Sequence, residues 1–390
     1  MIPSVLVSTR SAKLLHVVGA RPNFMKVAPI MAAVDRWNKN HSADSEAVAF
    51  SQTLVHTGQH YDDAMSAVFF RDLGLPAPDV DLGVGSGSHA QQTAEVLNRL
   101  EPVLLAVGPN LLIVVGDVNS TLAAALCAAK LRIPVAHVEA GLRSGDRAMP
   151  EELNRLLTDQ LADLLFTTSR DADENLAREG IPQRRIHFVG NTMIDALERL
   201  TARAQAGDAV RRFGLSAGGY ALVTLHRPSN VDDSEQLTRV VRLISEVAKR
   251  IPMVFPVHRR TRERLEKSGE SAVLEAQDSV LMTEPLGYLD FVGLMSEARL
   301  VLTDSGGVQE ETTVLGVPCL TLRTTTERPV TLTEGTNRLI DPLDSSAIES
   351  AVEDVLRAPF PTARRHPELW DGHAADRIVA EVAAWTRGLS

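Results

Sequence analysis

Short apolar runs recur along the chain, and each ends in glycine or in polar residues. The runs at 111–115, 133–138 and 164–168 lack the alternation of a half-exposed strand. They therefore predict parallel strands that are buried on both faces. Apolar positions at helical spacing, as at 24–34, or an alanine-rich stretch, as at 121–130, follow such runs. This alternation of strand and helix predicts an α/β fold with doubly wound sheets.

The second half of the chain repeats this order of elements. Apolar runs at 220–225, 253–257 and 300–302 predict further strands, and a stretch rich in Gly, Ala, Ser and charge at 207–219 separates the halves. A chain of 390 residues also exceeds the size at which single hydrophobic cores stop growing. We therefore predict two Rossmann-like domains with a ligand held in a cleft between them.

Composition and charge exclude several classes of protein. Forty basic and fifty acidic residues give a formal charge of −10, which argues against a nucleic-acid surface. Cys127 and Cys319 lie in apolar segments without metal-ligand spacing, so neither a disulfide scaffold nor a zinc site is expected. No signal-peptide pattern and no long apolar stretch is present. We expect a cytoplasmic protein without a membrane segment, with a loose leader over 1–12.

The stretch from Leu300 to Arg328 predicts a strand, a glycine turn, a helix and a second strand. A turn such as Ser305-Gly306-Gly307 leaves unpaired N–H groups at a helix N-terminus, where the helix dipole favours an anion. Glu310 and Glu311 in the first helical turn are candidates for contacts with sugar hydroxyls. In isolation, such a turn is more often an ordinary connection.

Acidic residues follow two successive strands of the first half, namely Asp117 and Glu139, and Glu151 begins the next helix. The carboxyl ends of parallel strands share one edge of a sheet, where open α/β sheets bind ligands. Two structural alternatives stay open here. Asp117 suits a helix N-cap. An i,i+4 pair with Arg155 and the helix dipole explain the charge of Glu151 well, and only its position after a loop favours a functional role.

Basic residues and histidines also follow predicted strands. Arg21 and Lys26 come after the first strand, and His226 and His258, each followed by arginine, leave strands of the second half. Charges at a helix start are usually solvated, and a lone histidine after a strand is more often structural than catalytic. Their shared position at strand ends favours a functional role only together with the glycine turn.

The chain resembles the non-hydrolysing UDP-N-acetylglucosamine 2-epimerases. The resemblance covers nearly the whole chain, and its motifs occur in the order found in that family. These motifs are Gly19-Ala20-Arg21-Pro22 with Lys26, Gly116-Asp117, the segment from His137 to Arg143, that from Pro150 to Arg155, Gly190-Asn191-Thr192, Leu225-His226-Arg227, the segment from Asp304 to Glu311, and that from Thr325 to Pro329.

The resemblance implies a glycosyltransferase-B-like pair of Rossmann-like domains. Their expected bounds are 1–190 for the domain with the catalytic carboxylates and 191–371 for UDP binding, with a C-terminal helix at 372–390 that packs back on the first domain. The resemblance also implies reversible conversion of UDP-GlcNAc to UDP-ManNAc. In this reaction UDP is lost to give a 2-acetamidoglucal intermediate, and UDP then adds to it again. Neither a metal nor another cofactor is implied, and a homodimer is expected.

The motifs also imply roles for single residues. Ser305, Gly306 and Gly307 match the diphosphate-binding turn, Glu311 the ribose contact and Phe291 the uracil pocket. The implied catalytic residues are Asp117, Glu139, Glu151, His226 and Lys26, without a choice of acid and base among the carboxylates. The implied substrate-binding residues are Arg21, Arg143, His258, Phe291, Ser305, Gly306, Gly307, Glu311 and Arg328.

Two departures from the family pattern bear on regulation and on the sugar. Many bacterial members have a second, activating nucleotide-sugar site, whose segment corresponds to Gln59 to Asp62 here; Asp62 replaces an expected glutamine, which does not favour such activation. Pro228-Ser229-Asn230 follows His226-Arg227 where other members carry Arg-Glu-Asn. Relatives acting on UDP-2,3-diacetamido-uronates share several motifs, so that sugar is the alternative substrate. A glycosyltransferase or a nucleotide-sugar sensor on this fold leaves the carboxylates unexplained.

Overall fold

The chain folds into two compact α/β units in the computed structural model, which describes residues 11–42, 47–58, 72–341, 344–360 and 366–388. Unit 1 comprises Met1–Ala196 with Glu368–Ser390, and unit 2 comprises Leu197–Pro367. The first boundary between them falls inside helix α7 (Thr192–Gln205). The sequence placed the boundaries at 190/191 and 371/372.

Unit 1 contains a parallel sheet with the strand order β3-β2-β1-β4-β5-β6-β7. Its central strands are fully buried apolar runs, as in Leu111–Val115. The strands are β1 (Ser11–Val18), β2 (Ala49–His56), β3 (Val80–Asp81), β4 (Leu111–Val115), β5 (Val135–Ala140), β6 (Leu164–Thr167) and β7 (Ile186–Phe188).

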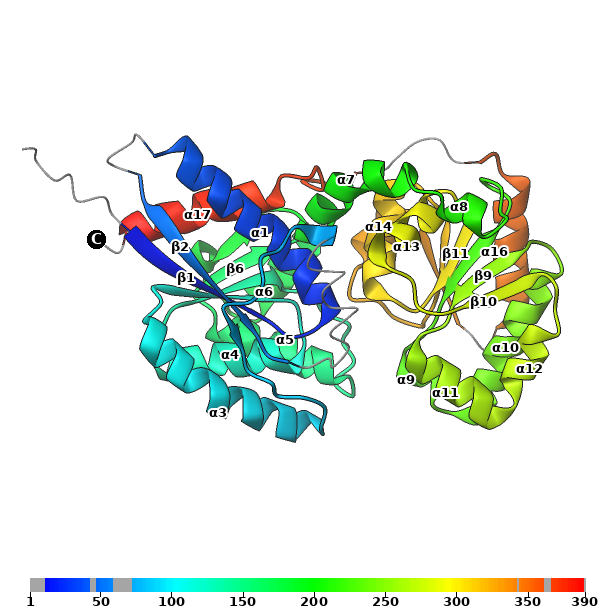
Figure 1. The fold of residues 1–390 in the computed structure, drawn as a ribbon, viewed down its shortest axis with the longest axis horizontal. Helices are drawn as coiled ribbons and strands as arrows, with labels where there is room; N and C mark the ends of the chain where they lie inside the picture. Colours follow the sequence, from blue (N-terminus) through cyan, green and yellow to red (C-terminus); the bar gives the residue numbers. More distant parts are fainter. Residues whose placement is uncertain (1–10, 43–46, 59–71, 342–343, 361–365, 389–390) are drawn as a thin grey trace, which may run out of the picture. The chain divides into compact units, whose positions relative to one another are not determined.

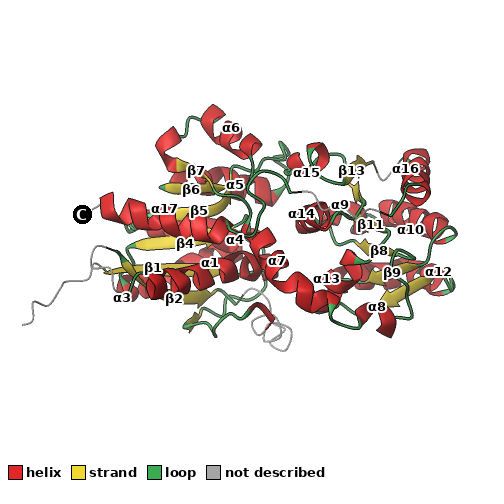
Figure 2. Ribbon diagram, turned by 90° about the horizontal axis from the view of Figure 1, so that it is seen from above, coloured by secondary structure: helices red, strands yellow, loops and turns green. Residues whose placement is uncertain are grey.

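Helices cover both faces of this sheet (Figures 1 and 2). One buried cluster joins the strands to α3 and α4 through residues such as Leu100 and Ala124. The other cluster joins them to α1 and to the C-terminal helix α17 through Ile30 and Ile378. The helices are α1 (Arg21–Asn40), α3 (His89–Val107), α4 (Asn119–Lys130), α5 (Pro150–Leu161), α6 (Arg170–Arg178), a 3-10 turn η1 (Gln183–Arg185) and α17 (Ala374–Gly388).

Unit 2 contains a second parallel sheet, with the order β10-β9-β8-β11-β12-β13. One large apolar cluster spans this sheet and the helices α10 and α16. The strands are β8 (Ala221–Thr224), β9 (Met253–Pro256), β10 (Val280–Thr283), β11 (Leu300–Thr303), β12 (Cys319–Leu322) and β13 (Asn337–Ile340).

The helices α9 to α15 of unit 2 lie between successive strands in the chain, as a doubly wound sheet requires, while α8 precedes the first strand and α16 follows the last. They are α8 (Ala209–Arg212), α9 (Pro228–Val231), α10 (Ser234–Ala248), α11 (Arg259–Ser268), α12 (Glu270–Glu275), α13 (Tyr288–Ser296), α14 (Gly306–Leu315), α15 (Val330–Thr333) and α16 (Ser345–Arg357). The prediction of two Rossmann-like doubly wound domains is confirmed.

The structure also differs from the sequence-based expectation in detail. Strand β1 begins at Ser11, inside the stretch that was expected to be a leader. The edge strands β3 and β13 were not predicted, because β3 has only two residues and β13 mixes polar with apolar positions. Within the described residues, no helix has both the length and the apolarity that a membrane crossing needs.

Each sheet has one point at which the strand order reverses direction along the chain. In unit 1 it lies between β1 and β4, and in unit 2 between β8 and β11. Open α/β sheets bind their ligands at the carboxyl ends of the strands at this point. The residues after β1 and β4, and those after β8 and β11, are therefore where each unit is expected to bind a ligand.

Candidate functional site

A buried ion pair lies at the switch point of unit 1. Lys26 of α1 and Glu139 of β5 face each other with Nζ and Oε2 2.6 Å apart, and their side chains are 5% and 3% exposed. Glu139 has φ +72°, which an L-residue rarely adopts, and the register of β5 against β6 shifts beside it. Such strain costs about 1–3 kcal/mol and collects at functional sites. The fold therefore supports an unfavourable backbone conformation in order to place this carboxylate.

Gly116, directly after β4, makes room for this pair. Its φ is +71°, and a Cβ atom there would lie 2.9 Å from Lys26 Nζ. Asn23 of α1 accepts hydrogen bonds from the amides of Gly19 and Ala20 and donates to the carbonyl of Val115. The first turn of α1 is thereby tied to the end of β4, where Asp117 follows.

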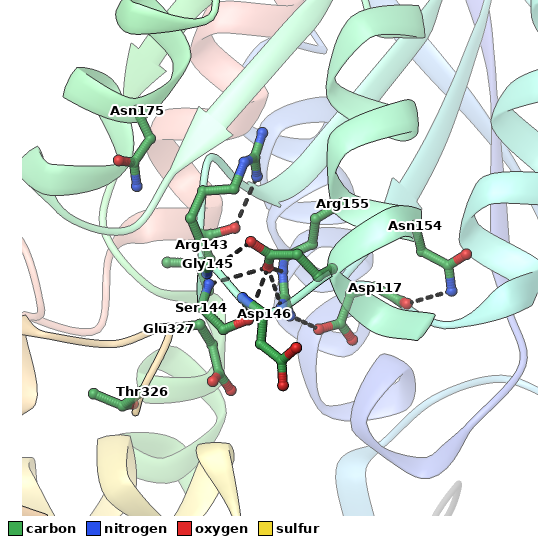
Figure 3. A network of polar contacts seen from close by, with 12 residues as sticks. Asp117, Arg143, Ser144, Gly145, Asp146, Asn154, Arg155, Asn175, Thr326 and Glu327 are labelled. Carbon is green, nitrogen blue, oxygen red and sulfur yellow. Dashed lines mark hydrogen bonds and ion pairs between the residues drawn. The ribbon is translucent and has the colours of Figure 1, made fainter. Parts of the chain in front are cut away.

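Asp117 is held by two residues of α5 (Figure 3). Arg155 Nη1 lies 2.5 Å from Asp117 Oδ2, and Asn154 donates to the Asp117 carbonyl at 2.9 Å. Arg155 is buried and also pairs with Glu152 at 2.6 Å. The N-cap of α4 is Val118, so the alternative that Asp117 only caps this helix is wrong. The Asp117 side chain stays 23% exposed, which leaves its carboxylate accessible.

A buried histidine stabilises the turn after β4 that contains Asp117. His137 Nδ1 lies 2.6 Å from Asp159 Oδ1, and Nε2 lies 2.8 Å from the Gly116 carbonyl. Burial raises the pKa of Asp159, but the charges of His137 and Arg143 outweigh it and hold that pKa below its usual range. Because a carboxylate and a carbonyl only accept, both ring nitrogens donate. His137 therefore has no ring nitrogen left for substrate.

Arg143 belongs to the same ionic network. It contacts Asp159 and Glu179, each at 2.7 Å, and donates to the carbonyl of Leu142. Its side chain is 10% exposed. These contacts hold the loop after β5, so the structure gives Arg143 a positioning role, and its expected contact with substrate stays a prediction.

The remaining predicted residues of unit 1 lie near the starts of α1 and α5. Arg21 is the first residue of α1. Glu151, partly exposed, stands in the first turn of α5, beside Glu152, whose buried carboxylate accepts from the amides of Ser144 and Gly145. Gln59 and Asp62 lie outside the described residues.

In unit 2 a single buried carboxylate organises the switch point. Asp304, after β11, is fully buried and accepts from the amides of His226 and Arg227 at 2.9–3.2 Å. It also accepts from Asn230 Nδ2 at 3.1 Å and lies 3.2 Å from His226 Nδ1. The ring centroid of His258, which is the N-cap of α11, lies 5.9 Å from the ring centroid of His226.

A cluster of three arginines and two glutamates lies beside the predicted anion-binding turn. Glu327 contacts Arg323 at 2.7 Å, Arg227 at 3.5 Å and also Arg328, which pairs with Glu310 at 2.8 Å. The arginine charges outweigh burial, so the pKa of Glu327 lies below its usual range.

Helix α14 begins inside this cluster. It starts at Gly306, and its N-cap Ser305 makes no side-chain capping bond. A Cβ atom at Gly306 would lie 2.5 Å from Arg328 Nη1. Glycine therefore lets a guanidinium approach the first turn, and cations together with a helix N-terminus favour an anion.

Glu311, the predicted ribose contact, is already engaged inside unit 2. Tyr288 of α13 donates to Glu311 Oε1 at 2.8 Å, and both side chains are buried. Burial raises the pKa of Glu311 to about 7, although the Tyr288 hydrogen bond opposes this rise. Phe291, partly exposed, follows Tyr288 on α13.

The sequence reasoning did not single out Asp159, Asp304 or Glu327 for a role of their own, although each organises other site residues. Asp304 carries nearly the same signal as Asp117, an acid within two residues of the end of a buried strand. Among the residues that the structure describes, no group of three or more His, Cys, Asp or Glu side chains is arranged to hold a metal ion.

Comparisons with known proteins agree with these motifs. A family model described as UDP-N-acetylglucosamine 2-epimerase matches residues 43–383. A UDP-N-acetylglucosamine 2-epimerase of Methanocaldococcus jannaschii is 43% identical over 349 residues, which are 88% of this chain and 92% of that relative. A UDP-2,3-diacetamido-2,3-dideoxy-D-glucuronate 2-epimerase of Pseudomonas aeruginosa is 40% identical over 375 residues, or 95% and 99% of the two chains.

Solved structures share the fold over almost the whole chain. The crystal structure of the Methanocaldococcus jannaschii UDP-GlcNAc 2-epimerase in complex with UDP-GlcNAc and UDP is 40% identical and has a TM-score of 0.86. The match covers 95% of this chain and 99% of that one.

Proposed function

Because the chain belongs to the UDP-N-acetylglucosamine 2-epimerase family, we propose that it interconverts UDP-GlcNAc and UDP-ManNAc at C2 of the sugar. The observation that carries the proposal is the buried Lys26–Glu139 pair at the switch point that also presents Asp117. A strained backbone and the burial of two charges both cost folding free energy. Acid–base chemistry on a weakly acidic carbon explains why the fold maintains both.

The proposed reaction needs two things at once. The C2 proton is not next to a carbonyl, so its removal requires a positioned base together with strong stabilisation of the departing UDP. UDP then leaves C1 to give a 2-acetamidoglucal, and protonation of C2 on the opposite face with re-addition of UDP inverts that centre. Asp117, Glu139 and Glu151, with Lys26, supply the carboxylates and a counter-charge in unit 1.

Unit 2 is assigned the nucleotide. We propose that the α14 N-terminus at Ser305 to Gly307 and Arg328 bind the diphosphate, with Glu311 on the ribose and Phe291 against the uracil. The Arg328 guanidinium beside the first turn of α14 and the open helix start support the diphosphate assignment, because both favour negative charge. His226 at the neighbouring strand end is proposed to act on the reacting sugar.

Exchange of the C2 proton tests this function directly. Purified protein incubated with UDP-GlcNAc in deuterated water is expected to incorporate deuterium at C2 and to form UDP-ManNAc. Asp117→Asn and Glu139→Gln are expected to abolish exchange while UDP still binds, whereas Gly306→Ala weakens UDP binding itself. Absence of exchange with the intact chain contradicts the proposal, and equal loss of UDP affinity in both classes of variant contradicts the division of labour.

A UDP-2,3-diacetamido-uronate is the second candidate substrate. The 40% identical Pseudomonas aeruginosa relative, matched over 99% of its length, carries that name. UDP-GlcNAc and a UDP-2,3-diacetamido-uronate are compared in the same exchange assay, and the compound with the larger kcat/KM is the substrate. Transfer to an acceptor without C2 exchange would instead indicate a glycosyltransferase. The homodimer and the cytoplasmic location stay predictions, and sedimentation of the purified chain tests the first.

A further inference from the structure

We propose that Asp304 is a positioning residue for His226, which it holds with the proton on Nδ1 so that Nε2 is the atom offered to the substrate. The inference deepens the proposed function and rests on it, because only that function gives His226 a reacting partner. No motif role covers Asp304, which the sequence presents only as the residue before a glycine turn.

The geometry gives Asp304 two separate tasks. Its carboxylate accepts from the backbone amides of His226 and Arg227, which fixes the turn after β8. The same carboxylate faces the ring, with Oδ1 3.2 Å from His226 Nδ1. Strands β8 and β11 are hydrogen-bonded neighbours, so a residue after one strand reaches the turn after the other. Holding the turn needs only the backbone contacts, and the ring contact is additional.

The charge of Asp304 decides which ring nitrogen carries the proton. Burial raises the pKa of Asp304, but the hydrogen bond and charge of His226, with the Arg227 amide and Asn230, lower it below its usual range. The carboxylate is therefore ionised and can only accept, so Nδ1 donates. The ring is 42% exposed, and no contact of Nε2 with another described residue is present. Nε2 is thus the nitrogen that can exchange a proton with a ligand.

The substitution Asp304→Asn separates the two tasks. The Asn carbonyl oxygen can still accept from the backbone amides, while its NH₂ group donates toward the ring. An NH₂ donor requires a lone pair on Nδ1 and therefore moves the ring proton to Nε2. Replacement of an orienting aspartate by asparagine in a serine-protease triad lowers kcat through this change of tautomer while the geometry is kept.

Nitrogen-15 NMR of the histidine rings in the full chain tests the tautomer without reference to any activity. The resonances of His226 are assigned by their loss in His226→Gln. We expect donor-type Nδ1 in the wild type and donor-type Nε2 in Asp304→Asn. A wild-type ring with the neutral proton on Nε2 overturns the proposal, and this arm needs no folded variant of Asp304.

Kinetics provide the second arm. Asp304→Asn is expected to lower kcat for C2 exchange by about 10²- to 10⁴-fold with KM and UDP binding nearly unchanged. The double variant with His226→Gln is expected to be no slower than His226→Gln alone. Additive losses would mean that Asp304 acts independently of the ring, which overturns the proposal.

A matched control uses the same chemical change in the same unit. Asp233 caps α10 through the amide of Gln236, and Asp233→Asn is expected to leave both kcat and the His226 resonances unchanged. A wild-type chain without exchange activity contradicts the proposed function, whereas the NMR arm still supports or overturns the positioning of the ring.

Discussion

Each unit pairs a buried aspartate with a histidine at the switch point of its sheet, yet the two pairs differ in what they leave free. In unit 1, His137 is fully buried, and both ring nitrogens are engaged by Asp159 and the Gly116 carbonyl. In unit 2, the ring of His226 is 42% exposed and contacts Asp304 through Nδ1. The same two residue types therefore build a support in one unit and a candidate reactive group in the other.

The difference shows which property separates structure from chemistry. A histidine whose two ring nitrogens are both engaged by the protein has no nitrogen left to exchange a proton with a ligand. A histidine with one anchored nitrogen does, because the other nitrogen remains available. Counting the satisfied ring nitrogens therefore distinguishes the two roles better than the residue's place after a strand.

Replacing His226 should give the largest effect on activity. We expect His226→Gln to lower C2 exchange by about 10²- to 10⁴-fold, while the free energy of unfolding changes by less than about 0.5 kcal/mol because the ring is partly exposed. Exchange kinetics and denaturant unfolding measure the two quantities. A strongly destabilised but active variant would reverse the comparison.

Replacing His137 should give the opposite pattern. His137→Gln leaves Asp159 and Arg143 buried without their third partner, and breaking a buried pair costs about 3–5 kcal/mol of stability. Denaturant unfolding checks the loss, with the exposed His373→Gln as the control, expected within about 0.5 kcal/mol of wild type. A stable His137→Gln chain would show that this network does not support the fold.

Glu311 extends the comparison to a carboxyl group whose pKa burial raises. Its pKa of about 7 lies above the usual value of 4.5, so the folded state binds the proton more tightly than the unfolded state. Stability from this group is therefore present below about pH 4.5 and is lost as the pH rises to 7. The difference in the free energy of unfolding between Glu311→Gln and wild type should therefore shift in favour of the variant by about 3 kcal/mol between pH 4.5 and pH 8. Unfolding at both pH values measures this change, and an equal difference at both would contradict it.

Replacing Gly116 should give the smallest change in stability, together with a selective loss of activity. Gly116→Ala should cost about 1–2 kcal/mol for a side chain at positive φ and also displace Lys26. Gly108→Ala is the matched control, because Gly108 has φ +57° and a Cβ atom placed there would meet no other atom within 4 Å. Both variants should lose similar stability, but only Gly116→Ala should lose C2 exchange. Equal activities would show that the position of Lys26 tolerates this shift.

The sequence was sufficient for features that depend on local pattern. Strand β4 has the predicted bounds because its five residues are all apolar and buried. The positions of Asp117, Glu139 and His226 at strand ends follow from the same periodicity. These features need only neighbours in the chain.

Contacts between distant segments could not be predicted in this way. The spacing within α5 suggested that Arg155 would pair along its own helix, whereas it also reaches Asp117 across the turn after β4. Asp159 pairs with His137 and Arg143 on another segment. The positive φ of Glu139 has no local signal either, because non-glycine residues rarely adopt it. Such features depend on how the sheet brings strand ends together.

Helix α17 also has a consequence for how the protein is made. Its residues Ile378, Val379 and Val382 complete a core cluster with α1, although the whole of unit 2 precedes them in the chain. On the ribosome, unit 2 emerges as one continuous segment and can fold as a whole. Unit 1, begun first, stays without this cover until α17 has been translated. A stop codon between unit 2 and α17 would therefore damage the unit that was synthesised first.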